Sequence, residues 1–245
     1  MRNDNNNIRT LAVVLSGGRG TRMGGDVPKQ YMEVCGFPLI YYSLKAFQES
    51  FVDEIVLVCG QGDEEYCRKE IAEKYDFTKV RKVVAGGKER YNSVLNGLNA
   101  AEDFDYVFIH DGARPFITGD ILRKALDETM EYGATVVAVP SKDTVKIADE
   151  DGFAKETPNR DSVWIMQTPQ TFKFDEIRFA YRKLEAAESD IKKRGIAITD
   201  DAMVMELFGQ RDIKFVMGSY RNIKITTPED LIIAKAYIEE SGDLR

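Results

Sequence analysis

The segment LSGGRGTRMGGDVPKQY, residues 15–31, combines glycines, which have no side chain, with positively charged residues. It contains five glycines and three cationic side chains, and it directly follows the apolar run TLAVVL. Glycines let backbone N–H groups approach phosphate oxygens, while Arg22 and Lys29 can neutralise phosphate charge. The glycines alone fit equally well a loop that only turns the chain, but the added cations favour a site for the phosphates of a nucleotide.

Two common glycine motifs are absent from this segment. A P-loop ends in Gly-Lys-Ser/Thr, whereas here Gly18 is followed by Arg-Gly-Thr-Arg-Met. A dinucleotide fingerprint needs a third glycine where this chain has Met23. The segment therefore predicts a nucleotide-binding loop of another kind, and it disfavours an NAD-dependent oxidoreductase.

The elements that must position this loop alternate along the first 140 residues. Predicted strands cover residues 10–16, 54–60, 80–87, 106–112 and 134–140, and predicted helices cover 38–50, 64–75, 89–102 and 119–133. Strands that are apolar throughout are buried on both faces, which with intervening helices indicates a doubly wound, mainly parallel α/β sheet. The strands end in Gly, Ser, Asp or Pro, where such sheets bind ligands.

The pattern changes over an insertion from about residue 143 to 172. Its first half, DTVKIADEDGFAKET, predicts two short strands around the turn 150–152, where Asp-Gly suits a tight hairpin. The insertion is polar on both faces and too short to have its own core, so it should pack on something else, and a partner subunit is one candidate. Predicted helices follow at 174–194 and 199–208, then a strand NIKIT at 222–226 and a helix that begins at Thr227-Pro228.

The composition limits the class of protein. No long polar linker divides the 245 residues, so we expect a single domain over 1–245. The net charge of −7 argues against non-specific nucleic-acid binding, which needs a broad basic surface. The chain has no secretory signal and no apolar run of about 18 residues, and its three cysteines form no CxxC pair. We therefore expect a cytoplasmic protein with no membrane partner.

Several motifs together resemble one family of nucleotidyltransferases. GGRGTRMGGDVPKQY is similar to the signature loop of enzymes that join a sugar or polyol phosphate to a nucleoside monophosphate. VAGGKERYNSVLNGL, IHDGARPF, DTVK, WIMQTPQTF, ITDDA and NIKITTPEDL, in that order, resemble 2-C-methyl-D-erythritol 4-phosphate cytidylyltransferase of the non-mevalonate isoprenoid pathway. The resemblance covers residues 11 to 235 and implies a Rossmann-like sheet with nucleotidyltransferase topology and a protruding β-hairpin arm.

The resemblance implies a reaction and its catalytic cations. The phosphate of the substrate attacks the α-phosphorus of CTP, which yields 4-diphosphocytidyl-2-C-methyl-D-erythritol and pyrophosphate. Arg22 and Lys29 would bind the CTP phosphates and stabilise the transition state. Arg160 and Lys224 would hold the polyol phosphate in line for attack, and Arg114 would hold that phosphate or brace its loop.

The resemblance also implies the nucleotide site and the cofactor. Asp111 would contact the ribose or a Mg²⁺ or other divalent cation, because Mg²⁺ prefers carboxylate and phosphate oxygens; a turn-forming aspartate is the alternative. His110 beside it is expected to be structural. The other residues expected to bind the nucleotide are small ones in the loops after strands: Ser16, Gly17, Gly18, Gly20, Gly86, Gly87, Ser93 and Gly112.

In the family the arm embraces a second subunit, so the resemblance implies a homodimer. Thr144 and Arg160 would reach the substrate across the interface, and Thr199 would contact it as well. Ordinary strand propensity also explains Thr144, and a helix N-cap also explains Thr199.

Two other functions remain open. Ribitol-5-phosphate cytidylyltransferases share the fold and first loop but tend to have Ser-Val where this chain has Gly112-Ala113. A regulatory protein could keep the fold and bind nucleotide without catalysis, although it would need no transition-state cations. The chain also departs from the family at Ser16-Gly17, where Ala-Ala is usual; small residues should serve there because the position is thought to act through its backbone.

Overall fold

The computed structural model describes residues 8–18 and 28–241. Its main sheet has seven strands in the order β11-β7-β10-β6-β1-β4-β5. Neighbouring strands are parallel except β10, which runs antiparallel to both β6 and β7. The strands are β1 (Thr10–Ser16), β4 (Glu54–Cys59), β5 (Val80–Ala85), β6 (Tyr106–Asp111), β7 (Ala134–Pro140), β10 (Trp164–Lys173) and β11 (Lys214–Met217). The predicted mainly parallel sheet is confirmed.

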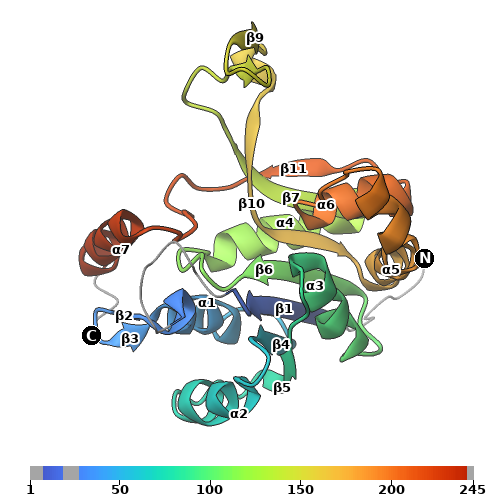
Figure 1. The fold of residues 1–245 in the computed structure, drawn as a ribbon. Coiled ribbons are helices and arrows are strands. Elements are labelled where there is room, and N and C mark those ends of the chain that lie inside the picture. Colours follow the sequence, from blue (N-terminus) through green and yellow to red (C-terminus); the bar gives the residue numbers. More distant parts are fainter. Residues whose placement is uncertain (1–7, 19–27, 242–245) are drawn as a thin grey trace, which may run out of the picture.

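Helices cover both faces of this sheet (Figure 1). Successive strand residues point to opposite faces, so Leu11 and Val13 pack with α3, α5 and α6, whereas Ala12 and Val14 pack with α1 and α4. The helices are α1 (Leu39–Gln48), α2 (Glu64–Tyr66), α3 (Arg90–Asn99), α4 (Gly119–Tyr132), α5 (Phe174–Lys193), α6 (Asp201–Val204) and α7 (Pro228–Ser241). This double layer confirms the doubly wound architecture.

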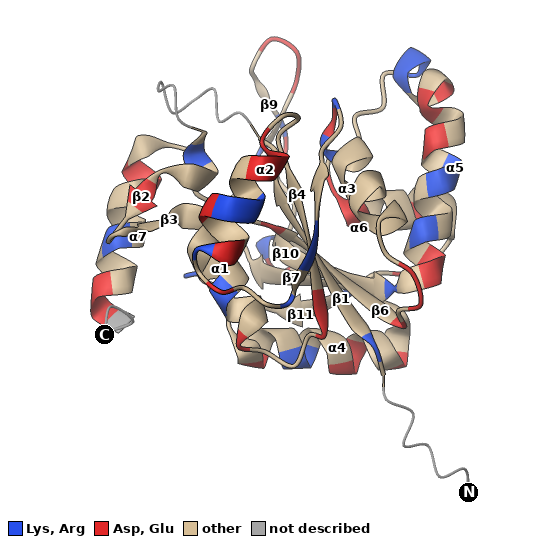
Figure 2. Cartoon of the chain, turned by 90° about the horizontal axis from the view of Figure 1, so that it is seen from below, with Lys and Arg blue, Asp and Glu red and all other residues tan. Residues whose placement is uncertain are grey.

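Local sequence signals explain where the helices lie. Helix α4 begins after Thr118, whose hydroxyl accepts a hydrogen bond from a backbone N–H in the first turn, and it ends at Gly133, where φ is +87°. Helix α5 buries one apolar face, while acidic and basic side chains are interspersed along the rest of it (Figure 2). Two helices continue as π-helical turns, α2 through Cys67–Glu73 and α6 through Met205–Gly209, and single 3-10 turns cover Lys29–Tyr31 and Arg160–Ser162.

The predicted hairpin arm is present but shorter than expected. Strands β8 (Ile147–Ala148) and β9 (Ala154–Glu156) pair around a turn in which Gly152 has φ of +85°, and they stand apart from the main sheet (Figure 1). The second part of the predicted insertion, from Trp164 onward, is β10 of the main sheet, where 167–172 are buried. Their polar side chains suggested a surface segment, but Gln167, Thr168 and Gln170 find hydrogen-bond partners inside the protein.

The predicted strand at 222–226 is not a strand. This extended segment is held by its own contacts: the Ile225 N–H donates to the carbonyl of Ala113, and the Asn222 side chain donates to the carbonyl of Thr168. The strand beside β7 is instead β11, which the sequence patterns did not indicate. A small two-stranded sheet, β2 (Glu33–Val34) with β3 (Phe37–Pro38), packs with α7 and the 222–226 segment in a third apolar cluster. In the described ranges, no helix is long and apolar enough to span a bilayer.

Candidate active site

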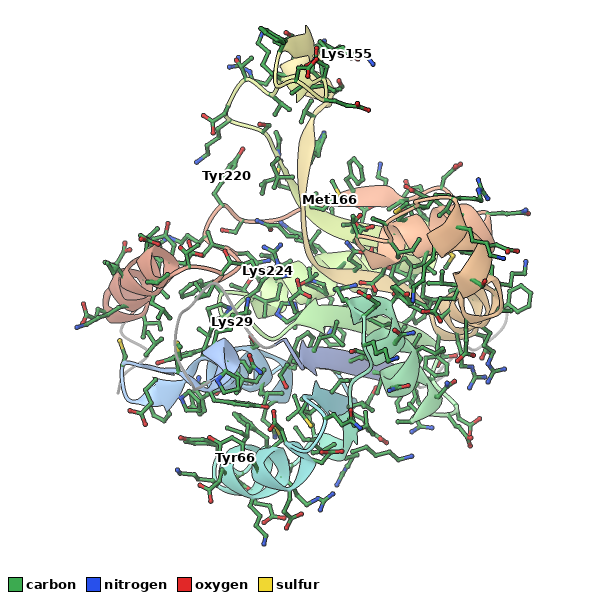
Figure 3. All side chains as sticks on the ribbon, in the orientation of Figure 1. Lys29, Tyr66, Lys155, Met166, Tyr220 and Lys224 are labelled. Carbon is green, nitrogen blue, oxygen red and sulfur yellow. The ribbon has the colours of Figure 1, made fainter. Side chains whose placement is uncertain are left out.

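The carboxyl ends of the central strands bring together lysines from the two ends of the chain. The Lys29 ammonium donates a 2.9 Å hydrogen bond to the carbonyl of Ile225, 196 residues away. Ile225 adjoins Lys224, whose ammonium lies 2.8 Å from Oδ2 of Asp111 at the end of β6. Figure 3 shows Lys29 and Lys224 in the same region, between the sheet and α7. The fold therefore joins two of the predicted catalytic residues.

Asp111 is surrounded by positive charge. Besides Lys224, Arg90 Nε lies 3.3 Å from Oδ1, and Arg114 Nε lies 3.8 Å from Oδ2. Burial would raise the pKa of Asp111, but the charges of Arg90 and Lys224 outweigh it and hold the pKa well below its usual range. Asp111 is therefore a carboxylate at neutral pH, and it fixes three cations near one point.

Arg90 joins Asp111 to a second, fully buried carboxylate. Its two terminal nitrogens donate to the two oxygens of Asp201 at 2.8 and 2.7 Å, and the Tyr181 hydroxyl also donates to Asp201. Burial would lower the pKa of Arg90, but the two carboxylates raise it above its usual value, so the guanidinium is charged. Sequence reasoning did not select Arg90 or Asp201, although both lie in the family-like stretches VAGGKERYNSVLNGL and ITDDA.

His110 is a neutral structural residue, as expected. Burial lowers its pKa to about 4. Its Nε2 lies 3.1 Å from the carbonyl of Arg114 and therefore carries the proton, while Nδ1 accepts from the Thr168 hydroxyl at 3.0 Å. That hydroxyl also accepts the backbone N–H of Asp111 at 3.1 Å. The imidazole thus fixes the loop that carries Asp111, and both of its nitrogens are engaged.

Arg114 braces the same loop. Its terminal nitrogens donate to the carbonyls of Asn222 and Met166, at 2.9 and 3.3 Å. Burial lowers its pKa, although Asp111 acts in the opposite direction. The buried Nε has no hydrogen-bond partner among the described residues. Of the two roles expected for Arg114, these contacts correspond to bracing, because they tie the segment before Lys224 to β10.

The glycine-rich loop is described only at its two ends. Ser16 ends β1, and its carbonyl accepts a hydrogen bond from the Gln30 side chain. A Cβ on Gly17 would lie 3.1 Å from the carbonyl oxygen of Cys59, whereas Gly18 faces open space. Gly20 and Arg22 lie outside the described residues. The hydrogen bond between Gln30 and Ser16 holds the two described ends of this segment together.

The turns after β5 and β6 require glycine for lack of space. A Cβ on Gly87 would lie 2.3 Å from the Cβ of Asn92, and one on Gly86 would lie 2.8 Å from the Ser93 hydroxyl. That hydroxyl accepts the backbone N–H of Gly87 at 3.0 Å, so it shapes the turn before α3. A Cβ on Gly112 would lie 2.9 Å from the carbonyl oxygen of Leu15. These residues form tightly packed turns at the carboxyl edge of the sheet.

Two of the other predicted substrate residues lie elsewhere within the subunit, and the third, Thr199, has no hydrogen bond to the Asp111 group within the described ranges. Thr144 and Arg160 are exposed on the arm, which projects away from the Asp111 region (Figure 1). Thr199 is exposed just before α6, and its hydroxyl contacts the sulfur of Met203; the N-cap of α6 is Asp200, not Thr199. The fold thus joins Lys29, Asp111, Arg114 and Lys224 but does not bring the arm residues to them.

The donor set restricts how a metal could bind. No group of three or more His, Cys, Asp or Glu residues within the described ranges could hold a metal ion. Both Asp111 oxygens already face cations. Mg²⁺ commonly takes one or two carboxylates and completes its shell with phosphate oxygens and water. The described residues therefore offer no metal site made by protein side chains alone, and a Mg²⁺ here would have to be held mainly by nucleotide phosphates.

Comparisons with known proteins cover almost the whole chain. The family model described as 2-C-methyl-D-erythritol 4-phosphate cytidylyltransferase matches residues 10–240. Proteins with this name from Lachnoclostridium phytofermentans and Lachnospira eligens are 47% and 48% identical; the alignments cover 96% and 93% of this chain and 98% of each relative. The crystal structure of 4-diphosphocytidyl-2C-methyl-D-erythritol synthase from Anaerococcus prevotii is 36% identical, with a TM-score of 0.81 over 95% of this chain and 96% of that one.

Proposed function

Because the chain belongs to the 2-C-methyl-D-erythritol 4-phosphate cytidylyltransferase family, we propose that it transfers CMP from CTP to 2-C-methyl-D-erythritol 4-phosphate and releases pyrophosphate. The observation that carries this proposal is the meeting of Lys29, Lys224 and Asp111 at the carboxyl edge of the sheet. A transfer between two phosphates needs cations fixed at one point, and this site supplies them.

The chemistry needs positive charge rather than a base. A phosphate monoester has a second pKa of about 6, so its oxygen is an anionic nucleophile at neutral pH. The one histidine of the chain has both nitrogens engaged inside the protein. The obstacle is repulsion between substrates, since two unit charges about 4 Å apart repel by roughly 4 kcal/mol at an effective dielectric of about 20. Fixed cations reduce this repulsion.

Each cation has a proposed partner. Lys29, with Arg22 from the same loop, binds the CTP phosphates and stabilises the negative charge that develops on the leaving pyrophosphate. Lys224 orients the attacking phosphate, which lowers the entropic part of the activation barrier. The tight turns at Gly86, Gly87 and Gly112, together with Ser93, border the cytidine. Mg²⁺ neutralises phosphate charge when it is bound, with Asp111 as its protein ligand.

We further propose that the arm completes the site of a second subunit. Strands β8 and β9 are too short to be stable alone, and the arm exposes Phe153 by 72% and Ile147 by 45%. A homodimer would cover these side chains and carry Thr144 and Arg160 to the partner. Mixing a Lys29→Met variant with an Arg160→Met variant tests this arrangement: exchange of subunits should restore about a quarter of wild-type activity, because half of the dimers are mixed and one of their two sites is intact. If mixing restores nothing while subunits exchange, Arg160 does not act across the interface.

The reaction itself is tested by pyrophosphate release from CTP and Mg²⁺. Methylerythritol phosphate and ribitol phosphate are compared as acceptors, with an Arg22→Ala, Lys29→Ala double variant as the control. We expect turnover with methylerythritol phosphate that the double variant lacks. Preference for ribitol phosphate would assign the chain the other acceptor, and tight CTP binding without release would favour a regulatory protein.

A further inference from the structure

Asp201 is a fully buried carboxylate with three donors. It accepts two hydrogen bonds from the Arg90 guanidinium and one from the Tyr181 hydroxyl, and it has no exposed surface. A buried carboxylate is costly unless such donors satisfy it. The two nitrogens of Arg90 meet the two oxygens of Asp201 in parallel, which fixes the plane of the guanidinium as well as its position.

The backbone around Asp201 is also fixed. The side chain of Asp200 accepts the N–H of Met203 and so caps α6. Gln170 in β10 accepts the backbone N–H of Ala202 at 2.7 Å and donates to Asp200 at 3.0 Å. Helix α6 is therefore attached to the sheet on both sides of Asp201, so the carboxylate is a rigid anchor.

Arg90 connects the fixed Asp201 carboxylate to Asp111 in the candidate site. With its terminal nitrogens committed to Asp201, its Nε faces Oδ1 of Asp111 at 3.3 Å. The other oxygen of Asp111 holds the Lys224 ammonium at 2.8 Å. Negative and positive groups thus alternate from α6 to the lysine. Lysine could not replace Arg90, because an ammonium has no planar fork that serves two carboxylates in fixed directions.

We propose that Asp201 is a positioning residue that acts through Arg90 and Asp111 to hold Lys224 for the transfer reaction. The proposal rests on the proposed function of the same site. Without the charge of Asp201, Asp111 is the remaining anion near Arg90. The guanidinium then moves toward Asp111 and competes with Lys224, and Lys224 loses its fixed position.

Steady-state kinetics test the proposal. Asp201→Asn should lower kcat about 10- to 100-fold with little change in KM, because an orienting interaction acts mainly in the transition state. Arg90→Lys should behave similarly, and Tyr181→Phe, which keeps the charges, should have a smaller effect in the same direction. Asp200→Ala is the matched control: it removes the cap of the same helix and one contact with Gln170, but it keeps the Asp201–Arg90 pair and the hydrogen bond between Ala202 and Gln170. It should therefore lower stability and reduce kcat far less than Asp201→Asn does. Equal losses of kcat in the Asp200 and Asp201 variants would mean that α6 has only a structural role.

A double-mutant cycle shows whether the effect passes through Lys224. In a Lys224→Met background, Asp201→Asn should cause little further loss of kcat. Losses that multiply independently would overturn the proposal.

A second readout does not require activity. Acetylation of lysines by a limiting acylating reagent, followed by mass spectrometry, measures how firmly Lys224 is held. We expect Lys224 to react several-fold faster in Asp201→Asn than in wild type or Asp200→Ala, relative to exposed lysines such as Lys69. Unchanged reactivity would refute the positioning role even if the enzyme is active. A wild-type protein that releases no pyrophosphate would refute the proposed function alone, and the acetylation result would still decide this inference.

Discussion

The buried imidazole of His110 makes the stability of this protein depend on pH in a predictable direction. Burial lowers the pKa of His110 from 6.5 to about 4 in the folded chain. Between these values the unfolded chain binds the proton and the folded chain does not. Because the unfolded state then holds more protons, the free energy of unfolding falls as the pH falls through this window.

The magnitude follows from the same two values. The loss is about 1.4 kcal/mol per pH unit inside the window, so lowering the pH from 7.5 to 5 should remove about 2 kcal/mol through this group. Because His110 is fully buried, solvent does not weaken the effect. A His110→Gln variant can keep a donor toward the Arg114 carbonyl, but it cannot titrate.

Urea unfolding at the two pH values measures the effect. Trp164, the only tryptophan in the sequence, lies in β10 against Phe215 and should report the transition by its fluorescence. Other titrating groups contribute to both proteins, so the relevant quantity is the difference between their pH dependences. We expect His110→Gln to be less stable at pH 7.5 but to lose about 2 kcal/mol less than wild type on acidification. If both proteins lose the same amount, His110 is not held neutral by the fold and this reasoning is wrong.

Glycine substitutions give three further predictions, all measurable by urea unfolding. Gly97→Ala should destabilise by about 1–3 kcal/mol, because a Cβ there would lie 2.5 Å from a methyl group of Val13 in the core. Gly119→Ala should instead stabilise by about 0.5 kcal/mol, because Gly119 is the first residue of α4 and, apart from its chain neighbours and the nearby backbone of its own helix, no atom lies within 4 Å of the new Cβ. A destabilised variant would show that the helix needs glycine there. Gly112→Ala should lower the free energy of unfolding by about 1–3 kcal/mol, because its Cβ would lie too close to the Leu15 carbonyl and displace the Asp111 loop. The same displacement should slow pyrophosphate release. Unchanged kcat would show that the conformation of this turn does not affect the reaction.

Local patterns in the sequence determined most of the secondary structure. Whether a segment is a strand or a helix follows from the spacing of its apolar residues, and each segment carries this spacing itself. The runs at 10–16 and 106–112 therefore predicted β1 and β6, and Thr227-Pro228 predicted the start of α7. The same logic failed at 222–226, where hydrogen bonds to distant residues hold an extended segment outside any sheet.

Motifs in the sequence also indicated Lys29, Asp111, Arg114 and Lys224, but only the tertiary structure decided how the site is held together. Polar side chains in β10 suggested a surface arm, whereas the fold places them where His110 and α6 supply partners. The bidentate pair of Arg90 with Asp201 joins residues 111 positions apart, and no local pattern marks it. Apolar spacing shows which face of a segment is buried, but a buried charge is stable only where its partner arrives, and that depends on how the whole chain packs.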